Sequence, residues 1–417
     1  MGYDAWTMHV VIFEGSYWRR FAPLALSRPV FSLVTGASTL LEKQIRYLRP
    51  ERLTLWVRPE MEGHCRQRIV PSLKIPTTIN TPLDEEPALL VSGRTLFLRK
   101  YEPPGQEAAV VEFGDSIRKA YVKRPGLSPR DMMERTEKWL SLLELPRDES
   151  QARCVESPWD LINWNEESLI EESTQRKGRP KAKMAGSVHF VNEEEVWLGD
   201  EVKLSPGCVI DASNGPVLMG DHVSVGANSV VQGPCYIGAY TGLKPMTLVR
   251  PGCSIGTMCR IGGEISNSIL LGWSNKSHEG FMGDSYIGKW VNLGAGTTTS
   301  NMKNTHGEIR MKMGEQEIPT GRRFLGSIMG DHVKTAIGTK LQAGTYVGFC
   351  SLLAGTRSVP KFVPSFTFWT DEKVEPYRLE KAIEVLKGVF ARKDRAWTEM
   401  DDELMRYVQR VAPEVER

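Results

Sequence analysis

The sequence predicts an α/β domain, then a parallel β-helix, then a C-terminal helical segment. Three observations indicate this fold class. Short apolar runs alternate with helical patterns up to about residue 170, and aliphatic residues then recur in steps of six. After about residue 370 the apolar spacing becomes that of a helix. At 417 residues the chain is also long enough for more than one domain.

The N-terminal part mixes strand-like and helix-like segments. The runs "HVVIFE", "RLTLWV", "ALLVSG", "LFLRKY" and "AVVEF" are typical of strands. The segments "GASTLLEKQIRYL" and "PRDMMERTEKWLSLLEL" carry apolar residues three and four apart, as helices do. This alternation favours an α/β domain with a largely parallel sheet over residues 1–175. The basic, Pro- and Gly-bearing stretch that follows predicts a linker over residues 176–186.

A repeat of six residues dominates residues 187–370. A helix repeats every 3.6 residues and a strand every 2, so neither explains a period of six. A hexapeptide repeat does, because each unit forms a short strand and a turn, and successive strands stack into a parallel β-helix. The same step occurs near residues 198–210 and 341–359. The unbroken aliphatic series comprises Val225, Val231, Ile237, Leu243, Val249, Ile255 and Ile261.

The last segment, residues 371–417, returns to a helical pattern. Leu379, Ile383, Leu386 and Phe390 fall on one face of a helix. We expect this segment to cover the open end of the β-helix or to reach a neighbouring subunit.

Composition narrows the class of protein. A net charge of +2 produces no large field, so it indicates neither nucleic acid nor an anionic membrane as partner. No apolar run approaches the roughly 20 residues of a membrane span, and no secretion signal is recognisable. The seven cysteines are odd in number and include no C-x-x-C pair, so we expect no disulfide framework and no zinc site. Reduced core thiols in a cytoplasmic protein are the expectation.

The six-residue count breaks at "SNKSHEGFMGDSYIGKWVNLGAGT", Ser274–Thr297. From Lys276 to Asn301 the sequence resembles the "KAGHLTYLGD…VNIGAGT…CN" segment of left-handed β-helix acyltransferases. Within them it looks most like the acetyltransferase half of the bifunctional glucosamine-1-phosphate acetyltransferase/N-acetylglucosamine-1-phosphate uridyltransferase family. The resemblance implies a left-handed coil, acetyl-CoA as co-substrate, an amino-sugar phosphate as acceptor and a homotrimer.

The resemblance also implies roles for single residues. His278 falls on the family's catalytic histidine, Asn292 on its sugar-site asparagine and Asn301 on the asparagine just beyond "GAGT". A histidine with a pKa near ~6.5 suits removal of a proton from an attacking amine near neutral pH. The segment that approaches acetyl-CoA corresponds here to Gly294, Ala295 and Gly296.

The sugar phosphate has two candidate cations. "LKP" and "VRPG" both resemble the family's basic "LRPG" strand, so either Lys244 or Arg250 would hold the phosphate. Glu264 is a candidate for orienting His278. Two departures leave the acceptor open: the family's tyrosine three residues after the histidine is Phe281, and its lysine twelve residues before is Ser266.

The N-terminal domain is a more distant match. "VVIFEGSYWRRFAPLALSRP" resembles the opening of a nucleotidyltransferase domain, and "PLALSRP" resembles a divergent branch of bacterial fusions. Gly15, Arg19 and Arg28 are the candidate nucleotide-binding residues. Where the family has a metal-binding aspartate, this chain has Gly93 and Arg94. UTP and Mg²⁺ would be needed only if this domain is an active nucleotidyltransferase.

Three functions compete. The first is acetylation of glucosamine 1-phosphate, which feeds UDP-N-acetylglucosamine and cell-envelope synthesis. The second is a sugar-nucleotide pyrophosphorylase whose β-helix serves only in oligomerisation. The third, a metal hydratase, needs three histidines at a subunit interface, and only His278 lies in a suitable stretch. His222 and His332 recur in equivalent "GDHV" turns, which indicates a structural role.

Overall fold

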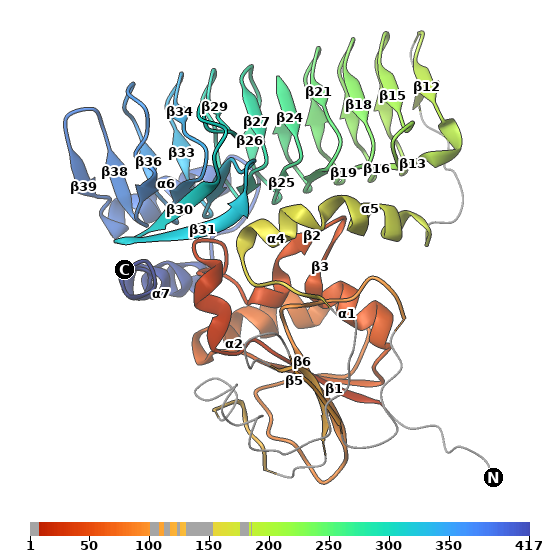
Figure 1. Ribbon diagram of the computed structural model, residues 1–417, viewed down its shortest axis with the longest axis vertical. Helices are drawn as coiled ribbons and strands as arrows, with labels where there is room; N and C mark the ends of the chain where they lie inside the picture. Colours follow the sequence, from red (N-terminus) through yellow and green to blue (C-terminus); the bar gives the residue numbers. More distant parts are fainter. Residues whose placement is uncertain are drawn as a thin grey trace. The chain divides into compact units, whose positions relative to one another are not determined.

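The fold was analysed in a computed structural model (Figure 1). The helix expected near residues 129–145 and the linker expected at 176–186 lie largely outside the described residues, so the domain boundaries stay predictions. The structure describes residues 8–100, 108–111, 117–122, 126–130, 153–175, 183–184 and 186–417.

The chain divides into two compact units. The first comprises Met1–Phe21, Arg28–Leu33 and Ser38–Ser157. The second comprises Ala22–Ser27, Val34–Ala37 and Pro158–Arg417.

A largely parallel sheet forms the first unit. Strand β1 pairs in parallel with β4 on one side and β6 on the other, and all residues of β1 and β6 are buried. Such strands have continuous apolar sequences because both faces of the sheet are covered. Helix α1 (Leu40–Leu48) begins with a capping box. Among the described residues, the strand order is β5 (Thr77–Ile79), β4 (Arg52–Trp56), β1 (His9–Phe13), β6 (Ala88–Ser92), β9 (Ile117–Val122) and β8 (Ala108–Val111).

The second unit is a parallel β-helix in which successive coils add one short strand to each of three sheets (Figure 1). The predicted order of an α/β domain followed by a β-helix is confirmed. Sheet I contains β11 (Lys183–Met184), β14 (Lys203–Leu204), β17 (Ser224–Val225), β20 (Gly242–Leu243), β23 (Arg260–Ile261) and β26 (Asn275–Lys276). Bridges through Asn292 extend it to β33 (Lys334–Thr335), β36 (Leu352–Leu353), β38 (Thr367–Trp369) and β39 (Val374–Pro376).

Sheets II and III complete each coil. Sheet II contains β12 (His189–Val191), β15 (Val209–Asp211), β18 (Val230–Gln232), β21 (Leu248–Val249), β24 (Glu264–Ser266) and β27 (Phe281–Gly283), and β29 (Thr298–Thr299) and β34 (Lys340–Leu341) pair beyond them. Sheet III contains β13 (Val196–Leu198), β16 (Val217–Met219), β19 (Cys235–Ile237), β22 (Cys253–Ile255), β25 (Ile269–Leu270), β28 (Tyr286–Ile287), β32 (Ser327–Met329), β35 (Thr345–Val347) and β37 (Phe362–Val363).

The inward positions of these strands form the core. All seven residues of the unbroken aliphatic series are at most 4% exposed, which confirms the hexapeptide reading. All seven cysteines are free and buried, as expected for core thiols. His222 and His332 both adopt positive φ at turns between sheets III and I, and His222 stacks on Tyr240 of the next coil.

Helices cover parts of the β-helix. Helices α4 (Pro158–Asn163) and α5 (Asn165–Ser173) lie along sheet III, where Asn165 accepts from Ser254 and donates to the Gly252 carbonyl. A hairpin of β30 (Ile309–Met313) and β31 (Gln316–Arg322) projects between β29 and β32.

Among the described residues, no helix is long and apolar enough to cross a membrane.

The C-terminal helices are α6 (Leu379–Ala391) and α7 (Glu399–Val415). The predicted apolar face of α6 is confirmed, since its four residues are buried. Helix α6 packs on the flank of the coils, where Phe390 stacks on Trp290 with ring centroids 4.3 Å apart. Behind α7, Glu416 accepts hydrogen bonds from the Tyr346 hydroxyl and from Ser365.

We predict that core and surface isoleucines of the β-helix differ sharply in their effect on stability. Ile261→Ala removes a fully buried side chain and should lower the free energy of unfolding by about 2–5 kcal/mol. Ile337→Ala, at a position 76% exposed, should change it by no more than about 0.5 kcal/mol. Urea titration of both variants measures these free energies of unfolding. Equal losses in the two variants would contradict the placement of Ile261 in the core.

Candidate functional site

A buried lysine occupies an inward position of the repeat two residues before His278. The inward position that Ile261 occupies in β23 is occupied in β26 by Lys276, which is 2% exposed. Its Nζ donates to the carbonyl oxygens of Gly262, at 2.8 Å, and His278, at 2.9 Å. Burial lowers the pKa of Lys276 to about 8. The lysine therefore ties the His278 backbone to the preceding coil from inside the β-helix.

Sequence reasoning missed Lys276, although a signal was present. The inward residues Leu270, Lys276 and Met282 are six apart, so the lysine keeps the phase of the repeat while changing its chemistry. Shortened steps lie on both sides of it, between the inward residues Ile261, Ile265 and Leu270 and between Met282 and Ile287. A charged residue at an inward position of the repeat was the sequence signal that could have identified Lys276.

His278 lies at the corner between sheets I and II, and its side chain is exposed. In the described part of the chain, the imidazole makes no hydrogen bond. The preceding coil presents Gly262 and Gly263 at the same corner, and a Cβ on Gly262 would lie 2.5 Å from the Ser277 carbonyl oxygen. Backbone therefore packs against backbone at this corner, which only glycine allows in the preceding coil.

The following coil presents the predicted acetyl-CoA segment at the same corner. Gly294 donates its amide to the Thr335 hydroxyl, and Gly296 has a φ of 71°. The Ala295 carbonyl accepts from the Gly338 amide at 2.7 Å. The structure thus brings Gly294, Ala295 and Gly296 beside the coil that carries His278.

Three predicted residues, together with Phe281, share the outer face of sheet II, which follows the His278 corner. Arg250 and Glu264 form an ion pair of 3.1 Å, so the structure pairs Glu264 with Arg250 rather than with the imidazole. Glu264 is in register with Phe281 of the next strand. A Cβ on Gly283 would meet both the Phe281 ring and the Asn301 amide, so these two side chains lie together above that glycine.

Buried Asp284 fixes the orientation of Asn301. Its carboxylate accepts from Asn301 Nδ2 and from Asn267 Nδ2, each at 2.6 Å. Ser266, where the family has a lysine, lies in register with Gly283 on the same face. This face of sheet II therefore combines a cation, a carboxylate, an amide and an aromatic ring.

The two other predicted sugar-site residues lie elsewhere. Lys244 is exposed at the corner between sheets I and II, two coils before His278. Asn292 is on sheet I, where its Oδ1 accepts from Asn275 Nδ2 at 3.4 Å. Asn292 and Asn301 thus flank the His278 corner on two different faces.

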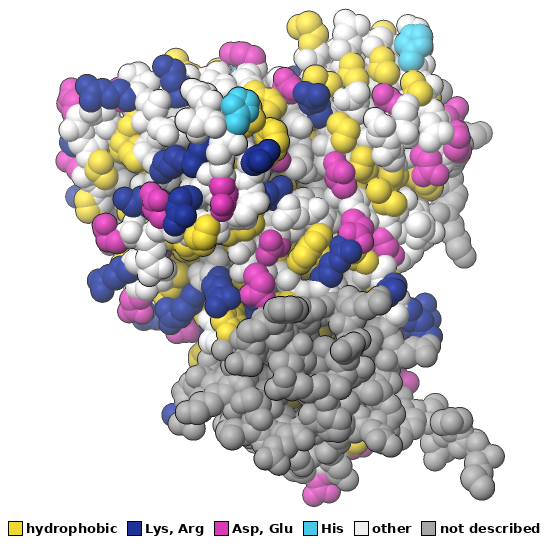
Figure 2. All heavy atoms as spheres, in the orientation of Figure 1, with side chains coloured by type: hydrophobic (Ala, Val, Ile, Leu, Met, Phe, Trp, Pro, Cys, Tyr) yellow, Lys and Arg dark blue, Asp and Glu magenta, His cyan; other side chains and the backbone are white. Residues whose placement is uncertain are grey.

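Figure 2 shows basic and acidic side chains interspersed over the visible face of the second unit.

The predicted nucleotide loop of the first unit contains a buried ion pair. After β1, Gly15 has a φ of 68° and the preceding residue, Glu14, is 1% exposed. The Glu14 carboxylate pairs with the Arg58 guanidinium and accepts from the Val30 and Arg58 amides. Burial raises the pKa of Glu14, and Arg58 opposes this shift. The Glu14 carboxylate therefore already occupies the Val30 and Arg58 amides.

The predicted arginines of this unit differ in environment. Arg19 is exposed beside the Trp18 ring, with 5.2 Å between guanidinium and ring centroid, whereas Arg28 is 5% exposed. Arg94 is buried, pairs with Glu156 at 3.1 Å and stacks over Tyr17 of the loop. The structure thus brings Arg94 to the loop, as expected from its position after β6.

The described residues of this loop do not fit a magnesium site. Mg²⁺ prefers carboxylate oxygens, but Gly93 and Arg94 follow β6, and Glu14 is already paired. No three His, Cys, Asp or Glu side chains in the described ranges form a metal-binding group. No magnesium-dependent step is therefore derived for this unit.

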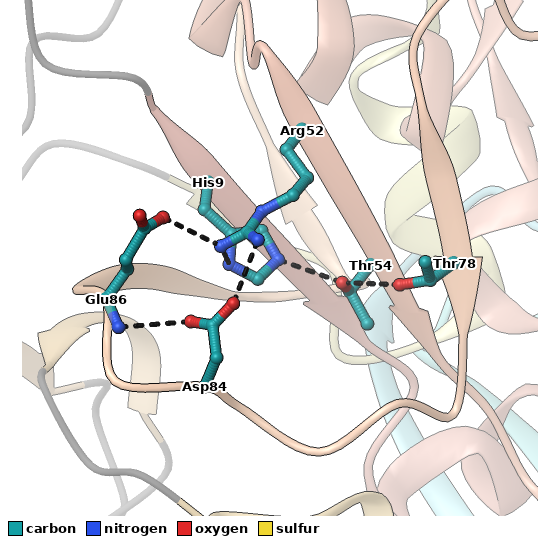
Figure 3. Close-up of polar contacts among 6 residues, drawn as sticks. All are labelled: His9, Arg52, Thr54, Thr78, Asp84 and Glu86. Atoms are coloured by element: carbon teal, nitrogen blue, oxygen red, sulfur yellow. Dashed lines mark hydrogen bonds and ion pairs between the residues drawn. The ribbon is translucent and has the colours of Figure 1, made fainter.

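A separate polar cluster lies at the start of the same strands (Figure 3). His9 Nε2 bonds the Thr54 hydroxyl at 2.8 Å, and Arg52 bonds His9 Nδ1 and pairs with Asp84 and Glu86. Burial and the Arg52 guanidinium lower the pKa of His9 to about 4. These residues are at the amino ends of β1 and β4, at the opposite ends of the strands from Gly15.

Residues 10–179 match the sugar nucleotidyl transferase family. A bifunctional sugar-1-phosphate nucleotidylyltransferase/acetyltransferase of Sulfurisphaera tokodaii is 30% identical over 240 residues, which cover 55% of this chain and 52% of that protein. A bifunctional GlmU protein of a Synechococcus species is 31% identical over 40% of this chain and 33% of its own length. Over these lengths the chain is similar to the bifunctional GlmU proteins.

The match is partial in length, since the chain spans about half, or a third, of these two relatives. Among solved structures, an Arabidopsis UDP-N-acetylglucosamine acyltransferase covers 57% of this chain and 92% of its own, at 13% identity and a TM-score of 0.25. That likeness is too weak to define the site, which is therefore described from this chain's own residues.

We predict that Lys276 makes stability depend on pH. Its folded pKa of about 8 lies below the usual value of 10.5, so the unfolded chain binds more protons between these values. The free energy of unfolding of the wild type should therefore rise relative to that of Lys276→Met from pH 8 to pH 10, by at most about 3 kcal/mol. Parallel urea titrations at pH 7, 8, 9 and 10 measure this difference, and a constant gap would contradict the buried lysine.

We predict that Arg58 is essential to the first unit. Arg58→Met leaves the Glu14 carboxylate buried without a counter-charge and should destabilise the unit by about 3–5 kcal/mol. Arg52→Met removes partly exposed ion pairs with Asp84 and Glu86 at the other end of the same strand, β4, and should cost no more than about 1 kcal/mol. Thermal unfolding of both variants measures their losses of stability. Equal losses would contradict the predicted difference between the buried and the partly exposed ion pairs.

Proposed function

We propose that this protein is an acetyl-CoA-dependent N-acetyltransferase acting on an amino-sugar phosphate, with glucosamine 1-phosphate as the first candidate. The observation that carries the proposal is the placement of an exposed His278 at a corner of the β-helix. The turns of the preceding and following coils at this corner are made of glycine and alanine. Polar faces lie on both sides of this corner, with Asn292 on one and Asn301 on the other. The similarity to bifunctional nucleotidylyltransferase/acetyltransferase proteins supports the same chemistry.

His278 serves as the general base. The neutral amine of the sugar attacks the thioester carbonyl carbon, and the imidazole accepts the proton that the nitrogen loses. The adduct then collapses with cleavage of the carbon–sulfur bond, and the departing thiolate receives the proton from the imidazolium. The Lys276 hydrogen bond to the His278 carbonyl holds the backbone of the base in place during these steps.

The acceptor lies against the outer face of sheet II. Arg250 supplies a fixed cation for the phosphate, because Glu264 orients its guanidinium and arginine suits bidentate phosphate binding. Asn301, held by Asp284, offers its remaining amide atoms to sugar hydroxyls. Phe281 replaces a hydroxyl contact with an apolar ring, which favours an acceptor that packs on the ring at that position.

The acyl donor lies along the corner of small residues. The turn of Gly294, Ala295 and Gly296 allows a thin pantetheine arm to approach the backbone closely. We infer that the exposed corner is completed by a neighbouring copy in a homotrimer. We also infer a cytoplasmic location, since all seven cysteines are unpaired and buried.

A sugar-nucleotide pyrophosphorylase is the second candidate, because residues 10–179 match the sugar nucleotidyl transferase family. The buried Glu14–Arg58 pair in the nucleotide loop weighs against it. Pyrophosphate release from UTP and a sugar phosphate, without acetyl transfer, would favour this candidate.

We predict that His278→Ala lowers kcat for thiol release from acetyl-CoA and glucosamine 1-phosphate by about 10²–10⁴. His189→Ala is the matched control, because His189 is also exposed and lies on sheet II at the far end of the β-helix. Its kcat should equal that of the wild type. Undiminished release in His278→Ala would contradict the assignment of the base, and no release from the wild type would contradict the proposed reaction.

A further inference from the structure

Two short segments of the N-terminal sequence belong to the second unit and contact its coils. They are Ala22–Ser27 and Val34–Ala37, which together are called the strap here. Every residue of Ala22–Ser27 is buried. The first segment contains most of the "PLALSRP" motif, to which the proposed function gives no role.

The first half of the strap is anchored on a turn of the β-helix. Ser27 Oγ donates to Asp331 Oδ2 at 2.7 Å, and these two residues are only 4% and 5% exposed. Gly330, in the same turn, packs on Pro23, because a Cβ at Gly330 would lie 3.0 Å from Pro23 Cβ. Hydrogen bonds to a carboxylate are among the stronger ones in proteins. The serine of the motif is therefore bound to the β-helix.

The second half of the strap is anchored on the preceding coil. Tyr286 of β28 is fully buried, and its hydroxyl accepts from the Val34 amide at 2.9 Å and donates to the Val34 carbonyl at 3.1 Å. The Gly36 amide donates to Asn165 Oδ1 of α5 at 2.6 Å. Buried polar groups are nearly always paired, and here the Tyr286 hydroxyl pairs with the backbone of the strap on both sides.

The strap thereby contacts two coils that are neighbours in space but distant in sequence. Tyr286 belongs to the earlier coil and Asp331 to the later one, and strands β28 and β32 of these coils pair in register. Between them the chain makes an excursion that includes the hairpin of β30 and β31. Closing a longer loop costs more conformational entropy, so contacts other than chain connection must support the register of these coils. The strap supplies such contacts to both.

Asp331 connects the strap to the turn proposed for the acyl donor. Its Oδ1 accepts from the Lys289 amide at 2.7 Å, from a residue 42 positions earlier in the chain. The coil that begins at Asp331 also holds the donor turn, since the Gly294 amide donates to the Thr335 hydroxyl at 3.0 Å. The Ala295 carbonyl accepts from an amide of the same coil. The position of the donor turn therefore depends on the coil to which the strap is bound.

A second turn of the same sequence shows what the strap adds. In both "GDHV" turns the aspartate accepts an amide from the turn one coil earlier, as Asp221 does from Asp200 at 2.8 Å. Asp221 is exposed, whereas Asp331 is buried and bonded to Ser27. The turn itself thus does not require a strap. The additional anchor occurs at the coil that supports Gly294–Gly296.

We propose that the strap is a positioning element for the acyl donor. It holds the coil of Asp331, and this coil holds the turn Gly294–Gly296 along which the pantetheine arm lies; the inference rests on the proposed function. The acceptor phosphate lies on Arg250, whose amide pairs with Ile265 of a different coil. Loosening the strap should therefore weaken the binding of acetyl-CoA and leave that of the acceptor unchanged. Ser27 is a positioning residue that acts through Asp331.

Four variants of the full-length protein test the proposal. Ser27→Ala removes the hydroxyl of the strap, and Asp331→Ala removes the acceptor of both the Ser27 hydroxyl and the Lys289 amide. Asp331→Asn is the conservative variant, because it keeps an oxygen for the amide and a donor for the hydroxyl. Asp221→Ala is the matched control in the equivalent turn. Hydrogen–deuterium exchange of the peptide containing Lys289 and steady-state kinetics of thiol release are measured for each, and thermal melts verify folding.

We expect Asp331→Ala to raise the exchange rate of the Lys289 amide about tenfold, and Ser27→Ala to raise it about threefold or more. Both variants should raise KM for acetyl-CoA about fivefold or more, while kcat and KM for glucosamine 1-phosphate stay within about twofold of the wild type. Asp331→Asn and Asp221→Ala should differ from the wild type by no more than about twofold in exchange at Lys289 and in both KM values.

Unchanged exchange at Lys289 in Ser27→Ala and Asp331→Ala would overturn the proposal. An unchanged KM for acetyl-CoA in these variants, or an equal rise in KM for both substrates, would overturn it as well. Ser27→Ala alone decides the outcome if Asp331→Ala does not fold. No thiol release from the wild type would contradict the proposed function, whereas the exchange rates would still decide whether the strap holds the turn of Lys289.

Discussion

The stacking of inward aliphatic side chains is the interaction on which the second unit depends. Each coil places one such residue above its equivalent, for example Val225, Leu243 and Ile261 in sheet I. Because neighbouring strands lie only ~4.7–4.9 Å apart, residues one coil apart in the sequence become neighbours at the corners. This spacing brings the coil of His278 between two turns made of small residues. A rigid core thereby fixes an exposed base.

Lys276 is the deviation from this core that lies nearest to the proposed base. A lysine at an inward position is desolvated, and burial of a charged group is unfavourable unless it is hydrogen-bonded. Here the two carbonyl oxygens that accept from Nζ belong to successive coils at the His278 corner. At this position a hydrogen bond to the backbone of the proposed base replaces the apolar packing found elsewhere in the core. Proteins commonly depart from regular patterns at functional sites, which supports the proposed role of this corner.

The regular parts of the fold could be predicted from local sequence. A period of six identified the β-helix and its inward residues, and the spacing of Leu379 and Phe390 identified the apolar face of α6. Contacts between distant residues could not be predicted in this way. The pairing of Glu14 with Arg58 spans 44 residues, and the separation of Asn292 and Asn301 depends on which side of a corner each falls. The partner of Glu264 was likewise set by stacking of coils, which placed Arg250 beside it.

The role of His278 as base is tested most directly by chemical rescue in a single turnover. His278→Ala, mixed in excess with limiting acetyl-CoA and saturating glucosamine 1-phosphate, should transfer the acetyl group about 10²-fold or more slowly than the wild type. Added imidazole should restore part of the rate in a saturable manner, because it can occupy the space left at the glycine-lined corner. A variant that transfers at the wild-type rate without imidazole would contradict the assignment.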